Sequence, residues 1–136
     1  MKIVLDTNVF ISAIFFGGQP AKILQAWRDR KIQIVLSEEI LSEYHRIAEG
    51  LSEKYPKIDI GRFFELLIHY SEMIETQHVS VAACEDSDDD KFLACAIASG
   101  SKLIVSGDKH LLHVSGYEGI SVLKPREFVD IHLKEI

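Results

Sequence analysis

The sequence predicts an α/β fold with three layers, α/β/α, in which helices cover both faces of a central parallel sheet. Short, continuous apolar runs alternate with amphipathic segments along the 136 residues. Strands that alternate with helices favour parallel pairing, and parallel strands buried on both faces are apolar throughout. No linker or internal repeat interrupts this pattern. A chain of this length buries roughly two-thirds of its surface on folding, so we expect one domain, of residues 1–136, with a Rossmann-like sheet.

Five strands and several helices are predicted along the chain. The segments that predict strands are KIVL (2–5), IQIVL (32–36), MIETQHVSV (73–81), KLIVS (102–106) and ISVL (120–123). The segments that predict helices are 9–15, 20–30, 38–48, 62–74 and 88–99, then a helical turn at 109–112 and a last helix at 126–133. Ser37 is expected to cap the third helix, and Gly100 to end the fifth. Pro20 and Pro125 suit the first turns of their helices.

Composition and charge exclude several classes of protein. No apolar run reaches the roughly 20 residues of a membrane span, and MKIVLDTNVF is no signal peptide, because Asp6 and Asn8 interrupt its apolar run. We therefore expect a cytoplasmic protein without a membrane partner, whose two cysteines are reduced. The net charge of −6 disfavours a protein that coats nucleic acid, which is usually basic. Nucleic acid is still allowed as a substrate, because cations held by acidic residues reverse the local charge.

The stretch EDSDDDKF, residues 85–92, holds five carboxylates within six positions. Such crowding is unfavourable unless a helix dipole or a bound cation compensates for it. Acidic residues also follow other predicted strands: Asp6 after the first, Glu43 on the helix after the second, and Asp108 after the fourth. Because function gathers at the carboxyl ends of parallel strands, we expect these acids and Asp90 at one edge of the sheet. Ligand sets made only of oxygen suit Mg²⁺ or Mn²⁺.

Each of these acids also has a purely structural interpretation. Ser87 with Asp90 three residues later resembles a capping box, and Asp6 could cap the helix that follows it. Asp108 could be a turn residue, and Glu43 could be a solvated position on a helix. These interpretations explain individual residues but not the whole acidic stretch. The argument for a cation therefore depends on the four sequence-distant acids taken together.

Four motifs are distinctive in their order and spacing: VLDTNVFISA near the amino terminus, SEEILSEY, DDDKFLACAIASG and VSGDKHLL. Together they make the chain resemble the PIN-domain family of ribonucleases, from residue 3 to about residue 128. In particular, they resemble the toxin components of bacterial and archaeal type II toxin–antitoxin modules. The resemblance implies that the chain is a single PIN-like nuclease domain.

The resemblance also implies a catalytic metal site built from four acids: Asp6, Glu43, Asp90 and Asp108. Asp90 matches the third acid of the family because it directly precedes KFLACA, and Asp88 or Asp89 could share that role. The polar residues at positions that support the ligands are Thr7, Asn8 and Ser106.

The activity implied by the resemblance is hydrolysis of RNA phosphodiester bonds with one or two Mg²⁺ or Mn²⁺ ions per site. Cations would activate water and stabilise the leaving oxygen, so no serine or cysteine nucleophile is required. Single-stranded or looped RNA is the expected substrate, because its exposed phosphates can enter a narrow cleft. Candidate RNA contacts flank the acids: Lys91, Lys109 and His110. The apolar helix at 62–74 could serve a homodimer or an antitoxin partner.

Three other interpretations compete with this one. A haloacid-dehalogenase phosphatase also places Asp after its first strand, but requires a second Asp two positions later, where this chain has Asn8. A response-regulator receiver requires an acidic pair after its first strand, and KIVLDTN supplies one acid. The third is a catalytically silent PIN fold that binds RNA or protein. The four acids argue against it, because a silent member has no need to keep them.

Overall fold

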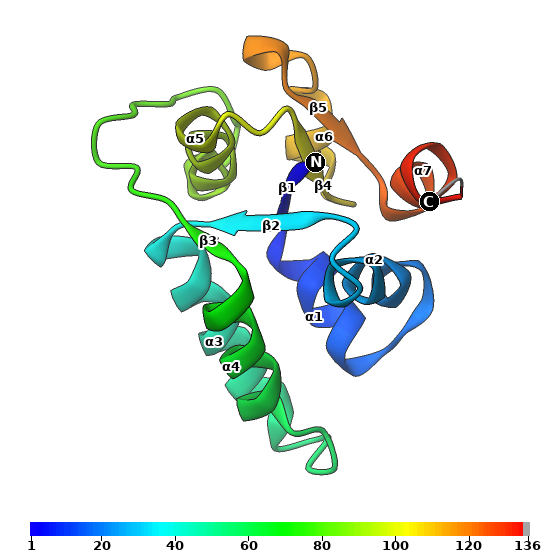
Figure 1. Cartoon of the computed structure of the whole chain (residues 1–136). Helices are drawn as coiled ribbons and strands as arrows, with labels where there is room; N and C mark the ends of the chain where they lie inside the picture. Colours follow the sequence, from blue (N-terminus) through cyan, green and yellow to red (C-terminus); the bar gives the residue numbers. More distant parts are fainter. Residues whose placement is uncertain (135–136) are drawn as a thin grey trace.

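The structure, a computed structural model, describes residues 1–134 and contains a five-stranded sheet (Figure 1). The strands are β1 (Lys2–Leu5), β2 (Gln33–Leu36), β3 (Glu72–Met73), β4 (Leu103–Val105) and β5 (Ser121–Leu123). They lie in the order β3-β2-β1-β4-β5, and every pairing is parallel. This arrangement confirms the predicted parallel α/β sheet. Because all strands run in the same direction, their carboxyl ends meet at one edge.

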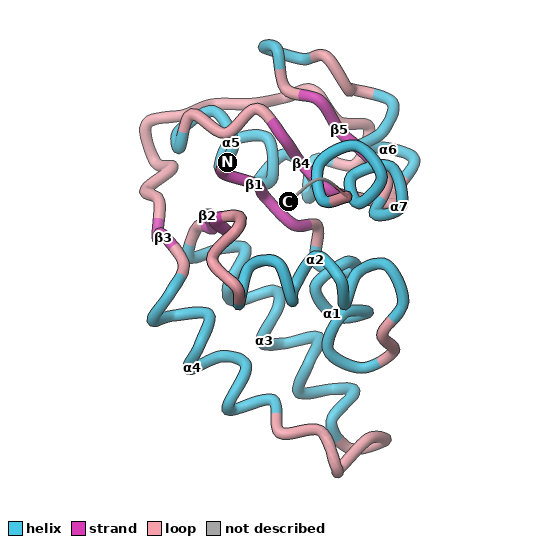
Figure 2. Tube along the Cα trace, turned by 45° about the vertical axis from the view of Figure 1, so that its right-hand side comes forward, coloured by secondary structure: helices cyan, strands magenta, loops and turns pink. Residues whose placement is uncertain are grey.

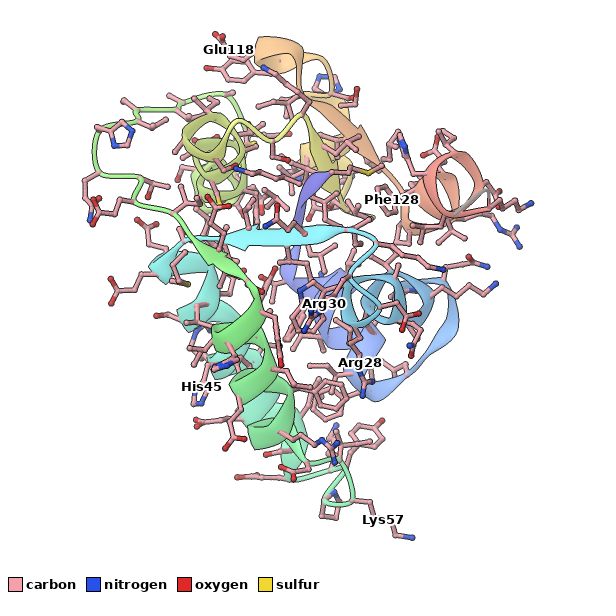
Figure 3. The ribbon with its side chains drawn as sticks, viewed as in Figure 1. Arg28, Arg30, His45, Lys57, Glu118 and Phe128 are labelled. Atoms are coloured by element: carbon pink, nitrogen blue, oxygen red, sulfur yellow. The ribbon has the colours of Figure 1, made fainter. Side chains whose placement is uncertain are left out.

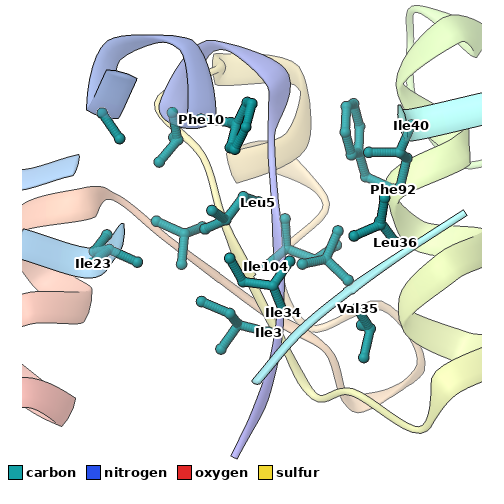
Figure 4. Packing of buried hydrophobic residues seen from close by; sticks show 14 of the residues in the cluster. Ile3, Leu5, Phe10, Ile23, Ile34, Val35, Leu36, Ile40, Phe92 and Ile104 are labelled. Carbon is teal, nitrogen blue, oxygen red and sulfur yellow. The ribbon is translucent and has the colours of Figure 1, made fainter. Parts of the chain in front are cut away.

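Helices surround the sheet and complete the three layers. They are α1 (Thr7–Phe15), α2 (Gly18–Arg28), α3 (Glu38–Ser52), α4 (Ile60–Tyr70), α5 (Asp90–Ser99), α6 (Lys109–His113) and α7 (Pro125–Phe128), with 3-10 turns at Ser87–Asp89 and Tyr117–Gly119 and a π-helical turn at Val129–Leu133. Figure 4 shows the strand side chains between Ile23 of α2 on one side and Phe92 of α5 on the other. Helices α3 and α4 form an antiparallel pair that extends away from the sheet (Figure 2). Among residues 1–134, no helix is long and apolar enough to cross a membrane.

The core is continuous across the sheet because the strands contribute fully buried aliphatic side chains, such as Ile3 and Ile34. Near the carboxyl edge, the ring of Tyr44 in α3 stacks on Phe10 of α1, with ring centroids 4.3 Å apart. The Tyr44 hydroxyl donates a hydrogen bond to the backbone carbonyl of Leu5, the last residue of β1. This buried contact fixes α3 against the end of the central strand.

Several helix ends agree with the prediction. Ser37 caps α3, because its Oγ accepts a hydrogen bond of 3.3 Å from the backbone N–H of Ile40. Gly100 ends α5 with a φ of 77°, a left-handed conformation that favours glycine over residues with a Cβ. Pro20 lies in the first turn of α2, and Pro125 begins α7.

The strand predicted within 73–81 is present, but it is much shorter than that segment and starts one residue earlier. Strand β3 comprises only Glu72–Met73, and the chain leaves the sheet soon afterwards as a loop. None of the side chains in the polar sequence ETQH, residues 75–78, is buried, so nothing holds this segment against the core as a strand requires. A short edge strand also exposes little unpaired backbone to association with other chains.

Two predicted helices have different ends in the structure. The helix predicted at 62–74 ends at Tyr70, because Ser71 has an extended backbone (φ −102°, ψ 155°) that leads directly into β3. The helix predicted at 38–48 continues to Ser52. Beyond Ala48 its apolar face continues through Leu51, which packs against the core.

Replacing Tyr44 by phenylalanine tests the contact between α3 and β1. The variant keeps the stacked ring but removes a donor to the buried Leu5 carbonyl oxygen. We therefore expect Tyr44→Phe to lower the free energy of unfolding by about 1–2 kcal/mol, measured by urea denaturation followed by circular dichroism. Tyr117→Phe is the matched control, since the hydroxyl of Tyr117 has no hydrogen bond among the described residues. An unchanged unfolding free energy in Tyr44→Phe would contradict this role.

Candidate metal centre

Asp6 lies directly after β1, at the start of α1. Its backbone N–H donates to the Val105 carbonyl at 3.0 Å, so the pairing of β1 with β4 extends to this residue. Its side chain is 6% exposed, and its carboxylate accepts a hydrogen bond of 2.6 Å from the Ser106 hydroxyl. It makes no capping hydrogen bond to α1, so the interpretation of Asp6 as a simple helix cap is wrong.

The electrostatic environment of Asp6 is unfavourable for a negative charge. Burial is the main reason that the pKa of Asp6 is raised, and the hydrogen bond from Ser106 opposes this effect. The negative charges of Asp108 and Glu43 raise the pKa of Asp6 further. These three acids come from distant parts of the sequence, yet they are close enough to repel one another.

Ser106 connects Asp6 to Asp108. The serine is fully buried, and while it donates to Asp6, its oxygen accepts a hydrogen bond of 2.9 Å from the backbone N–H of Asp108. Asp108 in turn caps α6, because its Oδ1 accepts a hydrogen bond of 2.7 Å from the His110 backbone N–H. One carboxylate oxygen of Asp108 therefore has a structural role. No hydrogen bond from the described residues engages the other, which leaves it available to a ligand.

Asp89, Asp108 and His110 form a group whose potential ligand atoms all lie within 4.8 Å of one another. Burial raises the pKa of Asp89 to about 6, together with the charges of Asp108, Asp86 and Asp6. The Nδ1 atom of His110 is buried and has no hydrogen-bond partner among residues 1–134. Repelling carboxylates beside an imidazole form a donor set that fits a divalent cation.

Asp90, the predicted third ligand, is 9% exposed and faces the loop before α5. Its Oδ1 accepts hydrogen bonds from the backbone N–H groups of Cys84 at 2.8 Å and Ala83 at 3.2 Å. The predicted capping box of Ser87 with Asp90 is wrong, because Asp86 caps this turn by accepting from the Asp88 N–H at 3.0 Å. The Cys84 thiol also interacts with the Asp90 carboxylate, which helps to raise the pKa of that thiol after burial has done so. A role for Asp90 in metal binding stays a prediction.

Glu43 is brought to the same edge by α3, but its carboxylate is already engaged by protein groups. Thr7 donates its hydroxyl hydrogen to one oxygen, and Lys91 of α5 lies 2.8 Å from the other. Burial alone would lower the pKa of Lys91, but its hydrogen bonds with Glu43 and Asp88 prevail and raise it. Lys91 therefore keeps its positive charge and neutralises acids, which is a different role from the predicted contact with RNA.

The remaining predicted residues are placed in different ways. Thr7 and Ser106 each hydrogen bond to a predicted ligand, as expected for supporting residues. Asn8 is exposed, and none of its hydrogen bonds among the described residues reaches the acids. Lys109 is exposed beside Asp108 and forms no ion pair within residues 1–134. His110 was expected only as an RNA contact; its spacing two residues after Asp108 is the one sequence signal for a ligand role.

The fold and this acidic edge define a PIN domain, and comparison with known proteins agrees. The chain matches the PIN domain family over residues 2–110. It therefore belongs to the PIN-domain family, whose members are generally nucleases that bind nucleic acid and use divalent metals.

One curated relative has a similar length. The chain is 32% identical to the uncharacterized protein MJ1680 of Methanocaldococcus jannaschii, over 96% of this chain and 90% of the relative. This similarity extends beyond residue 110 and supports the same fold throughout most of the chain.

The pKa of Asp89 leads to a prediction about stability. Its pKa is about 6 in the folded protein against 3.8 for the ordinary group, so its ionisation opposes folding. The opposition is absent below about pH 4, develops as the pH rises to about 6, and is complete above that. In EDTA at pH 8 we expect Asp89→Asn to raise the free energy of unfolding, on the order of 1 kcal/mol after allowing for solvent screening of a partly exposed group.

Urea denaturation of the wild type and Asp89→Asn at pH 4 and pH 8 measures this effect. Glu53→Gln is the control, because Glu53 is an exposed acid at the carboxyl end of α3, away from Asp6, Asp89 and Asp108. Equal stability of Asp89→Asn and the wild type at pH 8 would show that neither burial nor the charges of its neighbours oppose the ionisation of Asp89.

Proposed function

We propose that this protein is a single-domain, metal-dependent endoribonuclease of residues 1–136 that hydrolyses RNA phosphodiester bonds. The observation that carries the proposal is the convergence of Asp6, Asp89 and Asp108 on the carboxyl edge of the sheet, where burial and then the charge of Asp108 raise the pKa of the other two. A divalent cation would relieve this repulsion. Because the chain belongs to a family of nucleases, we propose that the cation takes part in phosphodiester hydrolysis.

The donor set favours Mg²⁺ or Mn²⁺, with one or two ions per site. Residues proposed to hold them are Asp6, Glu43, Asp90 and Asp108, to which the geometry adds Asp89 and His110. Carboxylate oxygens suit both ions, and an imidazole nitrogen is accepted more readily by Mn²⁺. We therefore expect Mn²⁺ to support at least as much activity as Mg²⁺.

The chemistry divides between the cation and the residues of the chain. When bound, a cation polarises the scissile phosphate and lowers the pKa of a water ligand. Ser106 holds Asp6 in one orientation, and the start of α6 fixes one oxygen of Asp108. The acids therefore orient ligands and do not act as nucleophiles. Lys109 is exposed beside Asp108, and we propose that it contacts a phosphate of the RNA.

Single-stranded or looped RNA is the proposed substrate, and the proposed role is that of a cytoplasmic toxin in a type II toxin–antitoxin module. Ile68 of α4 is 60% exposed and borders a hollow of about 470 Å³ between α3 and α4, beside Leu41 and Phe64. An exposed apolar side chain next to a hollow suits a protein partner. We propose this surface for an antitoxin or for a second copy of the chain.

Cleavage of a mixed pool of single-stranded RNA tests the activity. We expect cutting with Mn²⁺ or Mg²⁺, none with EDTA, and a loss of at least about 100-fold in Asp6→Asn and Asp108→Asn, because each removes a charged ligand. Asp130→Asn is the matched control, since this acid lies on the distant π-helical turn and pairs with Lys134. Full activity in folded Asp6→Asn would refute the assignment of the site.

The engagement of Glu43 favours the alternative, a silent PIN fold that binds RNA or protein without cutting. In the described arrangement, Lys91 and Thr7 occupy both carboxylate oxygens, so Lys91 must withdraw before Glu43 can bind a cation. Removing this competitor makes the edge more negative. We expect Lys91→Gln to lower the Mn²⁺ concentration needed for half-maximal cleavage several-fold, measured as a metal titration of RNA cleavage.

The same titration separates the two functions. A silent fold would bind Mn²⁺, detected by calorimetry, without cleaving any RNA in either the wild type or Lys91→Gln. If Lys91 instead contacts RNA, the substitution would weaken cleavage at every metal concentration.

A further inference from the structure

A pocket of about 630 Å³ lies between α2 and α4, at the amino-terminal edge of the sheet. Met1 and Gln33, at the starts of β1 and β2, contribute to its lining. The acids lie beyond the opposite ends of these strands, and a four-residue strand is roughly 13 Å long. The pocket is therefore separate from the candidate metal centre.

The pocket is strongly basic in a protein of net charge −6. Four of the 15 lysines and arginines line it, and among residues 1–134 no acidic residue does. Three of them, Arg28, Arg30 and Arg62, form no ion pair with a carboxylate among the described residues. Figure 3 shows Arg28 and Arg30 in the space between α2 and α4. Positive charges gathered without partners indicate an anionic ligand.

Aromatic rings, not acids, hold two of these arginines. The guanidinium of Arg28 lies 5.9 Å from the centre of the Phe63 ring, and that of Arg30 lies 5.6 Å from the centre of the Tyr70 ring. In such contacts the aromatic ring holds the guanidinium in position without using its N–H groups, which stay free to donate hydrogen bonds. The two arginines are thus pre-arranged for a ligand that accepts several hydrogen bonds.

Arg30 occupies a backbone position that favours glycine. Its φ is 63°, in the left-handed region, just after α2 ends. The N–H of Arg30 donates to the Trp27 carbonyl, and that of Lys31 to the Ala26 carbonyl, as at helix ends where glycine is common. An arginine is less stable than a glycine in this backbone conformation. Its presence here therefore indicates a function for the side chain.

We infer that this pocket binds the phosphate chain of a nucleotide, either free or at the 5′ end of an RNA. Arginine matches phosphate oxygens with paired N–H donors, and three unneutralised arginines match several adjacent phosphates. The volume of about 630 Å³ falls within the range of about 300–1,000 Å³ typical of small-ligand sites. Tyr70, half exposed at the rim, offers an aromatic surface beside the phosphates. The inference is independent of RNA cleavage at the acidic edge.

The first probe is inorganic tripolyphosphate, titrated into the full chain in EDTA at low salt. EDTA removes cations that could attract phosphate to the acidic edge. The chain has one tryptophan, Trp27, which lines the pocket, so its fluorescence reports binding there, and calorimetry confirms the affinity. The variants are Arg30→Gly and Arg62→Gln, with Arg126→Gln as the matched control because Arg126 is exposed on α7.

We expect saturable binding that weakens about tenfold or more in Arg30→Gly and Arg62→Gln, since each loses charge-assisted hydrogen bonds. Arg126→Gln should bind like the wild type. Because glycine suits the backbone at position 30, Arg30→Gly should also melt at an equal or higher temperature, which separates loss of binding from loss of folding. Equal affinity in all variants, or no saturation at millimolar tripolyphosphate, would overturn the inference.

A second set of probes distinguishes the two sources of the phosphate chain. ATP represents a free nucleotide, and an oligoribonucleotide with a 5′-triphosphate is compared with the same sequence bearing a 5′-hydroxyl. Binding of ATP alone supports a free nucleotide, and preference for the 5′-triphosphate RNA supports an RNA end. If tripolyphosphate binds but neither ATP nor the 5′-triphosphate RNA does, the site is an adventitious anion site only, and the inference fails.

Discussion

The candidate site depends first on the parallel pairing of β1 with β4. In this register Leu5 lies opposite Val105, so the next residues along the two strands, Asp6 and Ser106, are brought together at the edge. Ser106 then holds Asp6 through its hydroxyl and the Asp108 backbone through its oxygen. A slip of one residue would turn these side chains to opposite faces of the sheet. The buried aliphatic strands, which prevent such a slip, therefore also position the chemistry.

The second constraint is repulsion among the acids of residues 85–90. Much of it is relieved within the protein. Asp86 caps the turn, Asp88 lies 3.2 Å from Lys91, and Asp90 accepts two backbone hydrogen bonds. Asp89 lacks comparable support, and its pKa rises to about 6 beside Asp108 and Asp6. Most acids of this stretch therefore have structural roles. Asp89 is the one whose negative charge would be stabilised most by a bound cation.

The sequence predicted the architecture well because its signals are local. Continuous apolar runs predict buried parallel strands, and four of the five predicted strands coincide with observed ones. The exception, 73–81, shows the limit: an edge strand of two residues is defined by its pairing with β2 and by little in its own composition. The position of the acids at one edge followed from strand direction alone, without knowledge of any contact.

The details of the site were harder to predict because they depend on side-chain direction and on tertiary contacts. Asp88, Asp89 and Asp90 are consecutive, yet the change from a 3-10 turn to α5 between them points them to a lysine, to the acidic edge and to backbone amides. Lys91 was predicted to contact RNA because it flanks the acids in sequence. Its partner Glu43 lies 48 residues away on α3, and only the packing of α3 beside α5 reveals the pair.

Charge is arranged oppositely at the two ends of the sheet, and this arrangement bears on how one small chain could handle a polyanion. The carboxyl edge is acidic and repels phosphate until a cation binds, so affinity for RNA there should depend on metal. The amino-terminal edge carries unneutralised arginines, and its attraction for phosphate needs no metal but weakens with salt. Metal and salt therefore act on different ends of the molecule. An RNA held by its 5′ phosphates at the basic edge would stay close to the acidic edge, and its 5′ end would not occupy the proposed site of cleavage.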